Sequence, residues 1–586
     1  MKPNLRLILL LPLLFTACNT DIIEDTDVPV DSSSAVSIGP DDFINDADFN
    51  RTITITWSES GASVEGDEDG FVSVNGTRVT ADSTSDTTKV VKYILSGTCS
   101  DGSFKLYSLR KQALVLHDLN LTNYGGAPIN NQSHKRTFVV IEGSNALFDG
   151  TLDVPVEYGE TTEGEDLKAA FFSEGQLIFS GSKGSLGVYA QGKAAITSDD
   201  YIRFIDPGFV MARSIAGHAI RGKDAVQIDG GQIAAAAFAD GKKAICSDGP
   251  ITINDGQINV AAYGGVLSET TDSGTELTSA AAIKSDGTFT MTGGTLEGGC
   301  TGQGGKGISG DGDAVFSGGT VRIVAEGENY GSSSGPNFAP GWPGGPGGPG
   351  GGFNPGGEKD SSNSKSAKGI KFDGNITVSG GDITVKSTNH EALECKGKLT
   401  VTDGTLYAYS ASDDAINSGG DMTLSGGLVC ARSDGNDGLD ANGNLYIDGA
   451  TVYAISTKGN PEVAVDANSE GGKKLYLKSG TLIAAGGIES GSSITGTAYT
   501  TTGCTKNQWH SLYDEGGNLL ITFKAPELKS NSSVVVYNNG KSVKLMGKVT
   551  FSAVTQFWEG WGYLDATDGG SEVALSTYSG GGGMFR

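Results

Sequence analysis

The chain has 586 residues, of which 90 are glycine and 8% are aromatic. Its 69 acidic residues outnumber its 42 basic ones, giving a formal net charge of −27. This charge argues against nucleic acids and anionic membrane surfaces as partners, and it fits either a solvated acidic surface or one that binds cations. The length is enough for one long repeat domain with flanking units.

The N-terminus carries the features of a bacterial export signal. Basic residues precede a short apolar run at 7–15, which is too short to span a bilayer. The residues Phe-Thr-Ala-Cys at 15–18 resemble a lipobox, so we expect a signal peptide over 1–17 and a lipid on Cys18. The acidic segment 18–45 then predicts a tether, and the whole predicts an outer-membrane lipoprotein at the bacterial cell surface. An ordinary signal peptide that is cut elsewhere is the alternative.

Strand-like alternation of apolar and polar residues begins after this tether. RTITITW at 51–57 and VVKYILSG at 90–97 predict an N-terminal β cap over 46–103. LVLHDLNLTN at 114–123 predicts the first coils of a repeat domain, which we expect to extend over 104–490.

A repeat of about 23 residues dominates this domain, with three consecutive copies at 369–391, 392–414 and 415–437. A repeat of this length cannot bury its own apolar residues, so neighbouring copies must stack. Short alternating runs that are separated by Gly-Gly or Asp-Gly corners predict an all-β fold, a parallel β-helix. The apolar residue that opens each copy recurs as Ile220, Ile245, Ile283, Ile308, Ile370, Leu393, Ile416, Leu439 and Val465. A parallel series follows the turn glycine as Gly231, Gly256, Gly294, Gly319, Gly381, Gly404, Gly427 and Ala450.

Two long steps in these series mark insertions. The first is a polar loop at 264–279, and the second is a Gly/Pro/Ser-rich surface loop at 331–366. The repeat is lost after about residue 490. The strand-like runs at 518–528 and 532–547 then predict a small antiparallel C-terminal β unit over 491–586.

Several segments resemble a known family. ASDDAINSGGDMTLSGG (411–427), SDGNDGLDANGNLYIDG (433–449) and TITITWSESGASVEGDEDG (52–70) resemble the bacterial carbohydrate-binding β-helix family, whose members are similar to pectate-type polysaccharide lyases. The resemblance spans roughly residues 50–575. It implies a right-handed parallel β-helix, bound Ca²⁺ and binding of cellulose-like or acidic polysaccharides.

The repeat register also stacks acidic and amide residues in columns. Residues in one column lie about 5 Å apart, so their carboxylates repel each other unless a cation neutralises them. Ca²⁺ takes about six to eight oxygen ligands and favours such groups. We therefore expect Ca²⁺ between adjacent coils, with a solvated acidic ridge as the alternative. The predicted ligands are Glu391, Glu394, Asp413, Asp414, Asn417, Asp434, Asn436, Asp437, Asp440 and Asp466.

Outward strand positions beside these columns predict a glycan groove. Exposed tyrosines stack on the apolar faces of sugar rings. The alternative is that a loop or the C-terminal unit covers the tyrosines. Basic residues nearer the N-terminus, such as Lys243, Lys306 and Lys368, either bind uronate carboxylates or are ordinary solvated lysines. The predicted sugar contacts are Lys386, Tyr407, Tyr409, Arg432 and Tyr453.

Polysaccharide cleavage is a further possibility. A pectate-type lyase needs Ca²⁺ on the uronate and a basic residue that removes the C5 proton. Arg432, beside Asp434, is the nearest basic candidate and Lys386 is a weaker one. We expect a monomeric, non-catalytic, calcium-dependent protein that binds polysaccharide and contacts the membrane only through its lipid. A calcium-dependent lyase is the first alternative, and a surface adhesin or structural protein is the second.

Overall fold

The described residues of the computed structural model are 38–150, 156, 158–159, 162–271, 274–331, 363–530, 532–550, 556–564 and 569–580. Those from Asp41 onward belong to one compact unit. The predicted signal peptide, Cys18, most of the predicted tether and residues 332–362 of the predicted loop lie outside the described residues. None of the described helices has the length and apolar character needed to span a bilayer.

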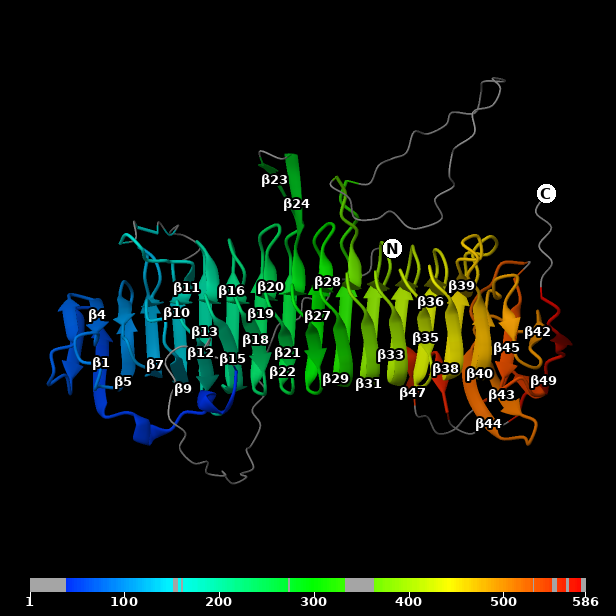
Figure 1. Cartoon of the computed structure of the whole chain (residues 1–586), viewed down its shortest axis with the longest axis horizontal. Coiled ribbons are helices and arrows are strands. Elements are labelled where there is room, and N and C mark those ends of the chain that lie inside the picture. Colours follow the sequence, from blue (N-terminus) through cyan, green and yellow to red (C-terminus); the bar gives the residue numbers. More distant parts are fainter. Residues whose placement is uncertain are drawn as a thin grey trace, which may run out of the picture. The chain divides into compact units, whose positions relative to one another are not determined.

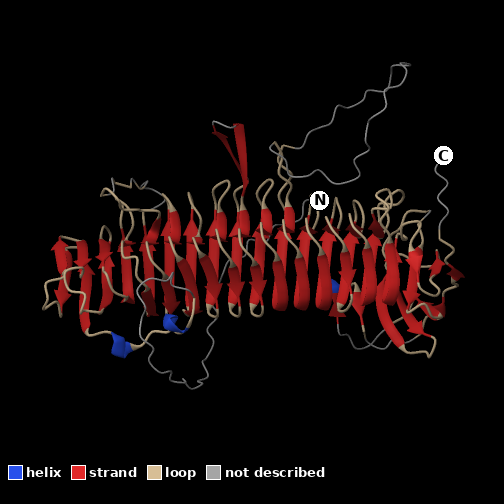
Figure 2. Ribbon diagram, in the orientation of Figure 1, coloured by secondary structure: helices blue, strands red, loops and turns tan. Residues whose placement is uncertain are grey.

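Each full coil contributes three short strands, for example β17 (Ile220–Gly222), β18 (Ala225–Ile228) and β19 (Gln232–Ala237). Each strand pairs in parallel with its equivalent in the next coil, namely β20 (Lys243–Ser247), β21 (Ile251–Ile253) and β22 (Gln257–Ala262). Figure 1 shows these coils stacked between β1 and β40, and Figure 2 shows that strands make up nearly all of the regular structure. The prediction of an all-β parallel β-helix is confirmed.

The first ladder is a 15-stranded sheet. Besides β17 and β20 it contains β3 (Val72–Asn75), β4 (Arg78–Asp82), β6 (Ser103–Tyr107), β8 (Ile129–Asn131), β11 (Ala169–Ser173), β14 (Ala194–Ser198), β25 (Ala281–Ser285), β28 (Lys306–Gly310), β30 (Lys368–Phe372), β32 (Leu393–Cys395), β34 (Ile416–Ser418), β37 (Leu439–Ala441) and β39 (Val465–Ala467).

The second and third ladders merge, because several long strands turn the corner between them without a break. These long strands are β7 (Gln112–Thr122), β29 (Ala314–Ala325), β31 (Ile376–Ser387), β33 (Leu399–Ser410), β38 (Leu445–Ser456) and β40 (Leu475–Ala485). The second ladder also contains β1 (Arg51–Ser58), β5 (Val91–Cys99), β9 (Thr137–Glu142), β12 (Leu177–Ser180), β15 (Tyr201–Asp206), β26 (Phe289–Met291), β35 (Met422–Leu424) and β41 (Ser493–Ile494). The third also contains β10 (Ser144–Phe148), β13 (Ser185–Ala190), β16 (Phe209–Ser214), β27 (Thr295–Cys300) and β36 (Leu428–Ser433).

Both markers of the sequence repeat hold the coils in register. The apolar markers pair with one another in unbroken series along the first ladder, from Ile220 to Val465, and all are fully buried. The seven glycines of the second marker series have φ between 73° and 105°, a region that other residues rarely adopt. At Gly427 a Cβ atom would also lie 2.7 Å from the carbonyl oxygen of Gly404 in the preceding coil. Glycine is therefore required at this corner by both φ and packing.

The segment predicted as an N-terminal cap, 46–103, instead forms the first coils. β1 pairs in parallel with β5, and β4 pairs in parallel with β6. The reason is that alternating residues of β1, such as Ile53 and Ile55, supply the same inward apolar face as later coils. Antiparallel partners accompany this end, since β2 (Gly61–Glu65) pairs with β1, and β3 pairs with β4. Short 3₁₀ helices precede it at Pro40–Asp42 and Asp46–Asp48.

Irregular elements interrupt the coils at the predicted insertions. The polar insertion forms an antiparallel hairpin of β23 (Val266–Thr271) and β24 (Gly274–Ser279), which projects from the coils in Figure 1. At the base of the second insertion, Tyr330 and Lys365 form an antiparallel bridge.

The C-terminal unit is an antiparallel β structure that packs against the last coils. β45 (Val534–Asn538) pairs antiparallel with β40, and β42 (Tyr499–Thr501) pairs with β45 and β50 (Ser576–Thr577). The C-terminal unit also contains a separate six-stranded sheet. Its strands are β43 (Trp509–Asp514), β44 (Leu519–Lys524), β46 (Val543–Gly547), β47 (Gln556–Phe557), β48 (Gly562–Tyr563) and β49 (Ser571–Glu572), with a 3₁₀ turn at Trp558–Gly560. The predicted antiparallel C-terminal unit is confirmed.

Candidate metal and carbohydrate site

The structure brings the predicted acidic columns together on the first ladder. Glu394 pairs with Asn417, Asn417 with Asp440, and Asp440 with Asp466 on strands β32, β34, β37 and β39. The parallel bridge between Val465 and Ile488 carries this column on to Glu489. Sequence reasoning missed Glu489, although it follows Asp466 by the repeat length of 23 residues.

Five acidic residues and one asparagine from adjacent coils form a continuous row. The Asn417 side chain amide donates to Asp414 Oδ2 at 3.1 Å and to Asp440 Oδ2 at 2.7 Å. The Asp437 backbone N–H donates to Asp414 Oδ1 at 3.0 Å, so these two equivalent residues of neighbouring coils are in direct contact. We call this set the acidic row; its members are Asp414, Asn417, Asp437, Asp440, Asp466 and Glu489.

The acidic row lacks compensating positive charge. Asp414 is 2% exposed and Asp437 is 8% exposed. Among the residues that the structure describes, no Lys, Arg or His nitrogen lies within 4.0 Å of the row's carboxylates. Buried carboxylates are normally paired with a cation or coordinated to a metal, because moving one charged group from water into the protein interior costs on the order of several kcal/mol.

Burial and mutual repulsion raise the pKa values of these carboxyls. Burial raises the pKa of Asp437 to about 9, with repulsion from Asp466 adding to the shift. Burial likewise raises the pKa of Asp466 to about 8 and that of Asp440 to about 7. The pKa of Asp414 is raised well above its ordinary value by burial and by the neighbouring acids. Without a cation, the row therefore holds protons at neutral pH.

The predicted ligands nearer the N-terminal coils are neutralised by protein cations. Lys368 Nζ lies 2.6 Å from Glu394 Oε2 and 3.2 Å from Glu391 Oε2. His390 Nδ1 contacts Glu391 and lies 3.0 Å from Asp413 Oδ2. Despite burial, these carboxylates raise the pKa of His390 to about 9, and Lys368 and His390 lower that of Glu391 to about 2. These three carboxylates form a closed ion-pair cluster beside the acidic row.

Two other predicted ligands have different partners. Asp434 accepts hydrogen bonds from Arg432 Nη2 at 2.9 Å and from the Tyr409 hydroxyl at 2.9 Å. Asp434 directly follows β36 of the third ladder, and its backbone N–H donates to the Ser410 carbonyl. It therefore lies in a different column from the acidic row, which is on the first ladder. Asn436 donates its amide to Asp413. The prediction that Asp434 is a metal ligand is corrected, because Arg432 neutralises its carboxylate.

The predicted tyrosine groove is not an open surface. Tyr407 is 2% exposed and Tyr453 is fully buried. Both belong to an apolar cluster with Leu512 of β43 and Trp558 of the C-terminal unit. The Tyr453 hydroxyl donates to the Lys524 carbonyl at 2.6 Å. The prediction that these tyrosines bind sugar is corrected: the C-terminal unit covers them, as in the alternative stated above.

The remaining predicted sugar contacts also face the C-terminal unit. The Arg432 guanidinium carbon lies 4.5 Å from the ring centres of both Tyr409 and Trp561. Lys386 Nζ lies 2.6 Å from Glu559 Oε1. These side chains therefore join the C-terminal unit to the third ladder.

The basic positions nearer the N-terminus are not an open ridge either. Lys306 is 4% exposed and Lys368 is 2% exposed. Burial lowers the pKa of Lys243. Lys284 forms an ion pair with Asp286 at 2.8 Å, and Arg221 with Asp248 at 2.6 Å. Buried or paired cations of this kind are not available to bind uronates.

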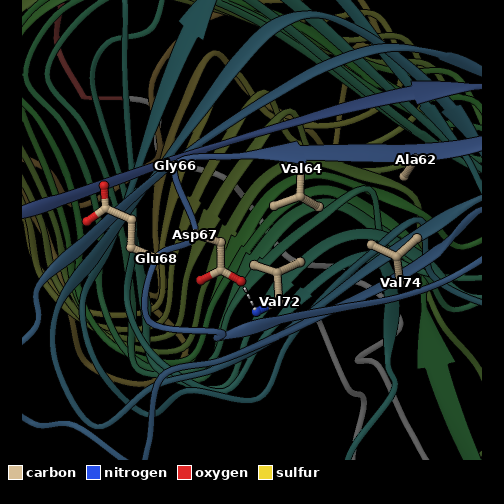
Figure 3. Close-up of a pocket in the computed structure, with 7 residues that line it drawn as sticks. All are labelled: Ala62, Val64, Gly66, Asp67, Glu68, Val72 and Val74. Atoms are coloured by element: carbon tan, nitrogen blue, oxygen red, sulfur yellow. Dashed lines mark hydrogen bonds between the residues drawn. The ribbon is translucent and has the colours of Figure 1, made fainter.

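A hollow of about 610 Å³ lies at the N-terminal end of the coils, between β2 and β3 (Figure 3). Val64 and Val72 line it together with Asp67 and Glu68. The Asp67 carboxylate accepts from the backbone N–H groups of Phe71 and Val72, and Glu68 pairs with an arginine of β1. Its charged groups thus stabilise the local turn.

Comparisons with known proteins identify the family. The family described as "Carbohydrate-binding domain-containing protein" matches residues 75–272 and 282–415. No curated protein matches the chain. A solved polysaccharide lyase-like protein from C. thermocellum, a gadolinium derivative, is similar with 19% identity and a TM-score of 0.29, covering 60% of this chain and 96% of that one. Because the family matches more than half of its residues, the chain belongs to the carbohydrate-binding domain-containing protein family.

Proposed function

We propose that the protein binds a polysaccharide without cleaving it, and that Ca²⁺ held by the acidic row is required for this binding. Membership of a carbohydrate-binding family supports the first part. The observation that carries the second is a row of buried and partly buried carboxylates that have no cationic partner among the described residues.

The donor types of the acidic row suit Ca²⁺. The row carries five carboxylates and one amide, distributed over successive coils, and hard cations such as Ca²⁺ prefer oxygen ligands of this kind. Sulfur ligands are missing from the row, and His390 is engaged by Glu391 and Asp413. When bound, Ca²⁺ supplies positive charge that offsets the repulsion between carboxylates of adjacent coils. Asp440 and Asp466 are only partly buried, so the row is within reach of solvent and of an acidic polysaccharide.

The positions of the two candidate bases favour binding over cleavage. A lyase base has to reach the C5 proton of a bound uronate. Arg432 lies between Tyr409 and Trp561 and is paired with Asp434, while Lys386 is paired with Glu559. Neither side chain is directed at the acidic row.

Incubation with polygalacturonate tests this proposal. We expect no increase in the ultraviolet absorbance of unsaturated uronate product, with or without Ca²⁺, while the protein is retained by the polymer. Absorbance that rises with Ca²⁺ and is lost on chelation would establish the lyase alternative. The Arg432→Gln variant then shows whether this arginine takes part.

We further propose that the protein is an outer-membrane lipoprotein at the bacterial surface, with Cys18 as the lipid site. The lipobox-like residues 15–18 and the acidic segment after them support this. In the native host we expect wild-type protein in the membrane fraction and Cys18→Ser in the soluble fraction. Equal membrane association of the two would contradict the anchor.

A further inference from the structure

The third ladder presents a strip of small side chains on its outward face, over strands β16, β19, β22 and β27. In register, Ala234 pairs with Asn259, and Ala236 pairs with Ala261 and then with Gly299. Ala236, Ala261 and Gly299 are partly exposed. This is the same face that the C-terminal unit covers further along the ladder, at Tyr407 and Tyr453.

A row of planar side chains runs along this strip. The rings of Phe148 and Tyr189 stack with their centres 4.8 Å apart, and those of Phe238 and Tyr263 stack at 4.7 Å. Arg213 lies between the pairs: it is the register partner of Tyr189, and its guanidinium carbon is 4.6 Å from the Phe238 ring centre. Tyr263 is 50% exposed. This row of planar side chains consists of Phe148, Tyr189, Arg213, Phe238 and Tyr263.

Apart from its contact with the Phe238 ring, Arg213 has no ion-pair or hydrogen-bond partner among the described residues. Every other arginine within the described ranges forms an ion pair or a hydrogen bond, whereas Arg213 has neither, and its Nε atom is buried without an acceptor. In a chain with 69 acidic residues, an arginine without a carboxylate partner is unexpected. A guanidinium stacked on a ring keeps its N–H groups in the plane, where they form paired hydrogen bonds with a carboxylate.

Amide side chains flank the strip. Gln232, Gln257 and Asn259 are exposed on β19 and β22. Amides donate to and accept from sugar hydroxyls, and aromatic rings stack on the apolar faces of sugars. Since neighbouring coils lie about 4.8 Å apart, equivalent positions recur along the axis at a spacing close to one sugar unit of an extended polymer.

We propose that the outward face of β13, β16, β19 and β22 binds a uronate-containing polysaccharide that lies along the coil axis. Arg213 pairs with a uronate carboxylate, Tyr263 stacks on a sugar ring, and the amides of Gln232, Gln257 and Asn259 contact hydroxyls. This inference rests on the proposed carbohydrate-binding function and adds a second contact surface for the same polymer. That surface lies on the third ladder, separate from the acidic row on the first ladder and from the predicted tyrosine groove.

The test compares Arg213→Gln and Tyr263→Ala with two matched controls. Arg221→Gln removes an arginine that is paired with Asp248, and Tyr446→Ala removes a partly exposed tyrosine that stacks on Tyr476. Binding is measured by calorimetry with soluble polygalacturonate and by sedimentation with swollen cellulose, a neutral polymer. Thermal unfolding confirms that each variant is folded.

For Arg213→Gln we expect affinity for polygalacturonate to fall about tenfold or more, as for loss of a hydrogen bond to a charged group, with little change in any cellulose binding. Arg213→Lys should restore part of the affinity, and the deficit should shrink at high salt. Tyr263→Ala should weaken polygalacturonate binding about tenfold, in the range of a lost aromatic stack. Both controls should bind as wild type does.

If the wild type binds polygalacturonate and both Arg213→Gln and Tyr263→Ala bind it with the same affinity, this site is overturned and the proposed function stands. A wild type that binds cellulose but not polygalacturonate would overturn this site alone, and failure to bind either polymer would overturn both. Self-association of the wild type that Tyr263→Ala abolishes, without a change in polymer affinity, would identify a second copy of the chain as the occupant and would also overturn the proposal.

Discussion

Removal of Ca²⁺ at neutral pH is expected to lower the free energy of unfolding by about 3 to 4 kcal/mol. This is the stabilisation that a ligand at about 100 to 1,000 times its Kd gives to the folded state alone. The physical reason is that Asp414, Asp437, Asp440 and Asp466 lose their only counter-charge within the described structure. Chemical denaturation with Ca²⁺ and with chelator measures the difference.

The same row predicts the sign of the pH dependence without metal. Folding raises the pKa of Asp437 to about 9 and that of Asp466 to about 8, whereas in the unfolded chain an aspartate titrates at about 3.9. Between these values the folded state binds more protons than the unfolded state, so metal-free stability should fall as pH rises from about 4 to about 9. Ca²⁺ bound as proposed would require the ionised carboxylates, so its stabilising effect should grow over the same range.

An Asp437→Asn variant separates metal binding from simple burial. It removes one ionisable group from the row, so the metal-free protein should be more stable than wild type above neutral pH, while added Ca²⁺ should stabilise it less. The control Asp403→Asn changes an exposed aspartate at a corner of β33 and should behave as wild type. Equal responses of all three proteins to Ca²⁺ would place the ion elsewhere.

Tyr453→Ala is expected to destabilise the protein by about 3 to 5 kcal/mol, as for other large aromatic residues truncated in a core. Tyr453 is fully buried between the third ladder and the C-terminal unit, with ring contacts to Phe523 and Trp558. Its truncation leaves a cavity and removes the hydrogen bond to the Lys524 carbonyl. Urea denaturation measures the loss.

Tyr446→Ala serves as the control for this effect, because Tyr446 is partly exposed on the second ladder. Its cost should be about 1 kcal/mol or less. Polymer binding by folded Tyr453→Ala should match that of the wild type. A small stability change together with lost binding would instead revive the tyrosine groove.

The register of the coils was predictable because two chemically distinct features repeat together. Apolar residues such as Ile416 must face the core, and corner glycines such as Gly427 must adopt positive φ. If the apolar residues were shifted along the chain relative to the corner glycines, either the apolar residues would leave the core or the glycines would leave the corners. The spacing therefore predicts which residues of neighbouring coils pair. The column of Glu394, Asn417, Asp440 and Asp466 follows directly from it.

The surroundings of those columns were less accessible to sequence reasoning. Which face the C-terminal unit covers depends on apolar contacts of Tyr453 with distant residues such as Phe523, which is 70 positions away, and no repeat links the two. The pairing of Lys368 with Glu391 and Glu394 depends on where a long side chain bends. By contrast, Phe238 and Tyr263 are 25 residues apart, the spacing of adjacent coils there, so their stacking could have been found from the sequence.

The affinity of the wild-type protein for polygalacturonate, measured by calorimetry in Ca²⁺ and again in excess chelator, tests the central claim most directly. The account predicts saturable binding in Ca²⁺, loss of that binding on chelation and no unsaturated product in either sample. Equal affinity in both conditions would contradict the calcium dependence, and cleavage of the polymer would contradict the non-catalytic function.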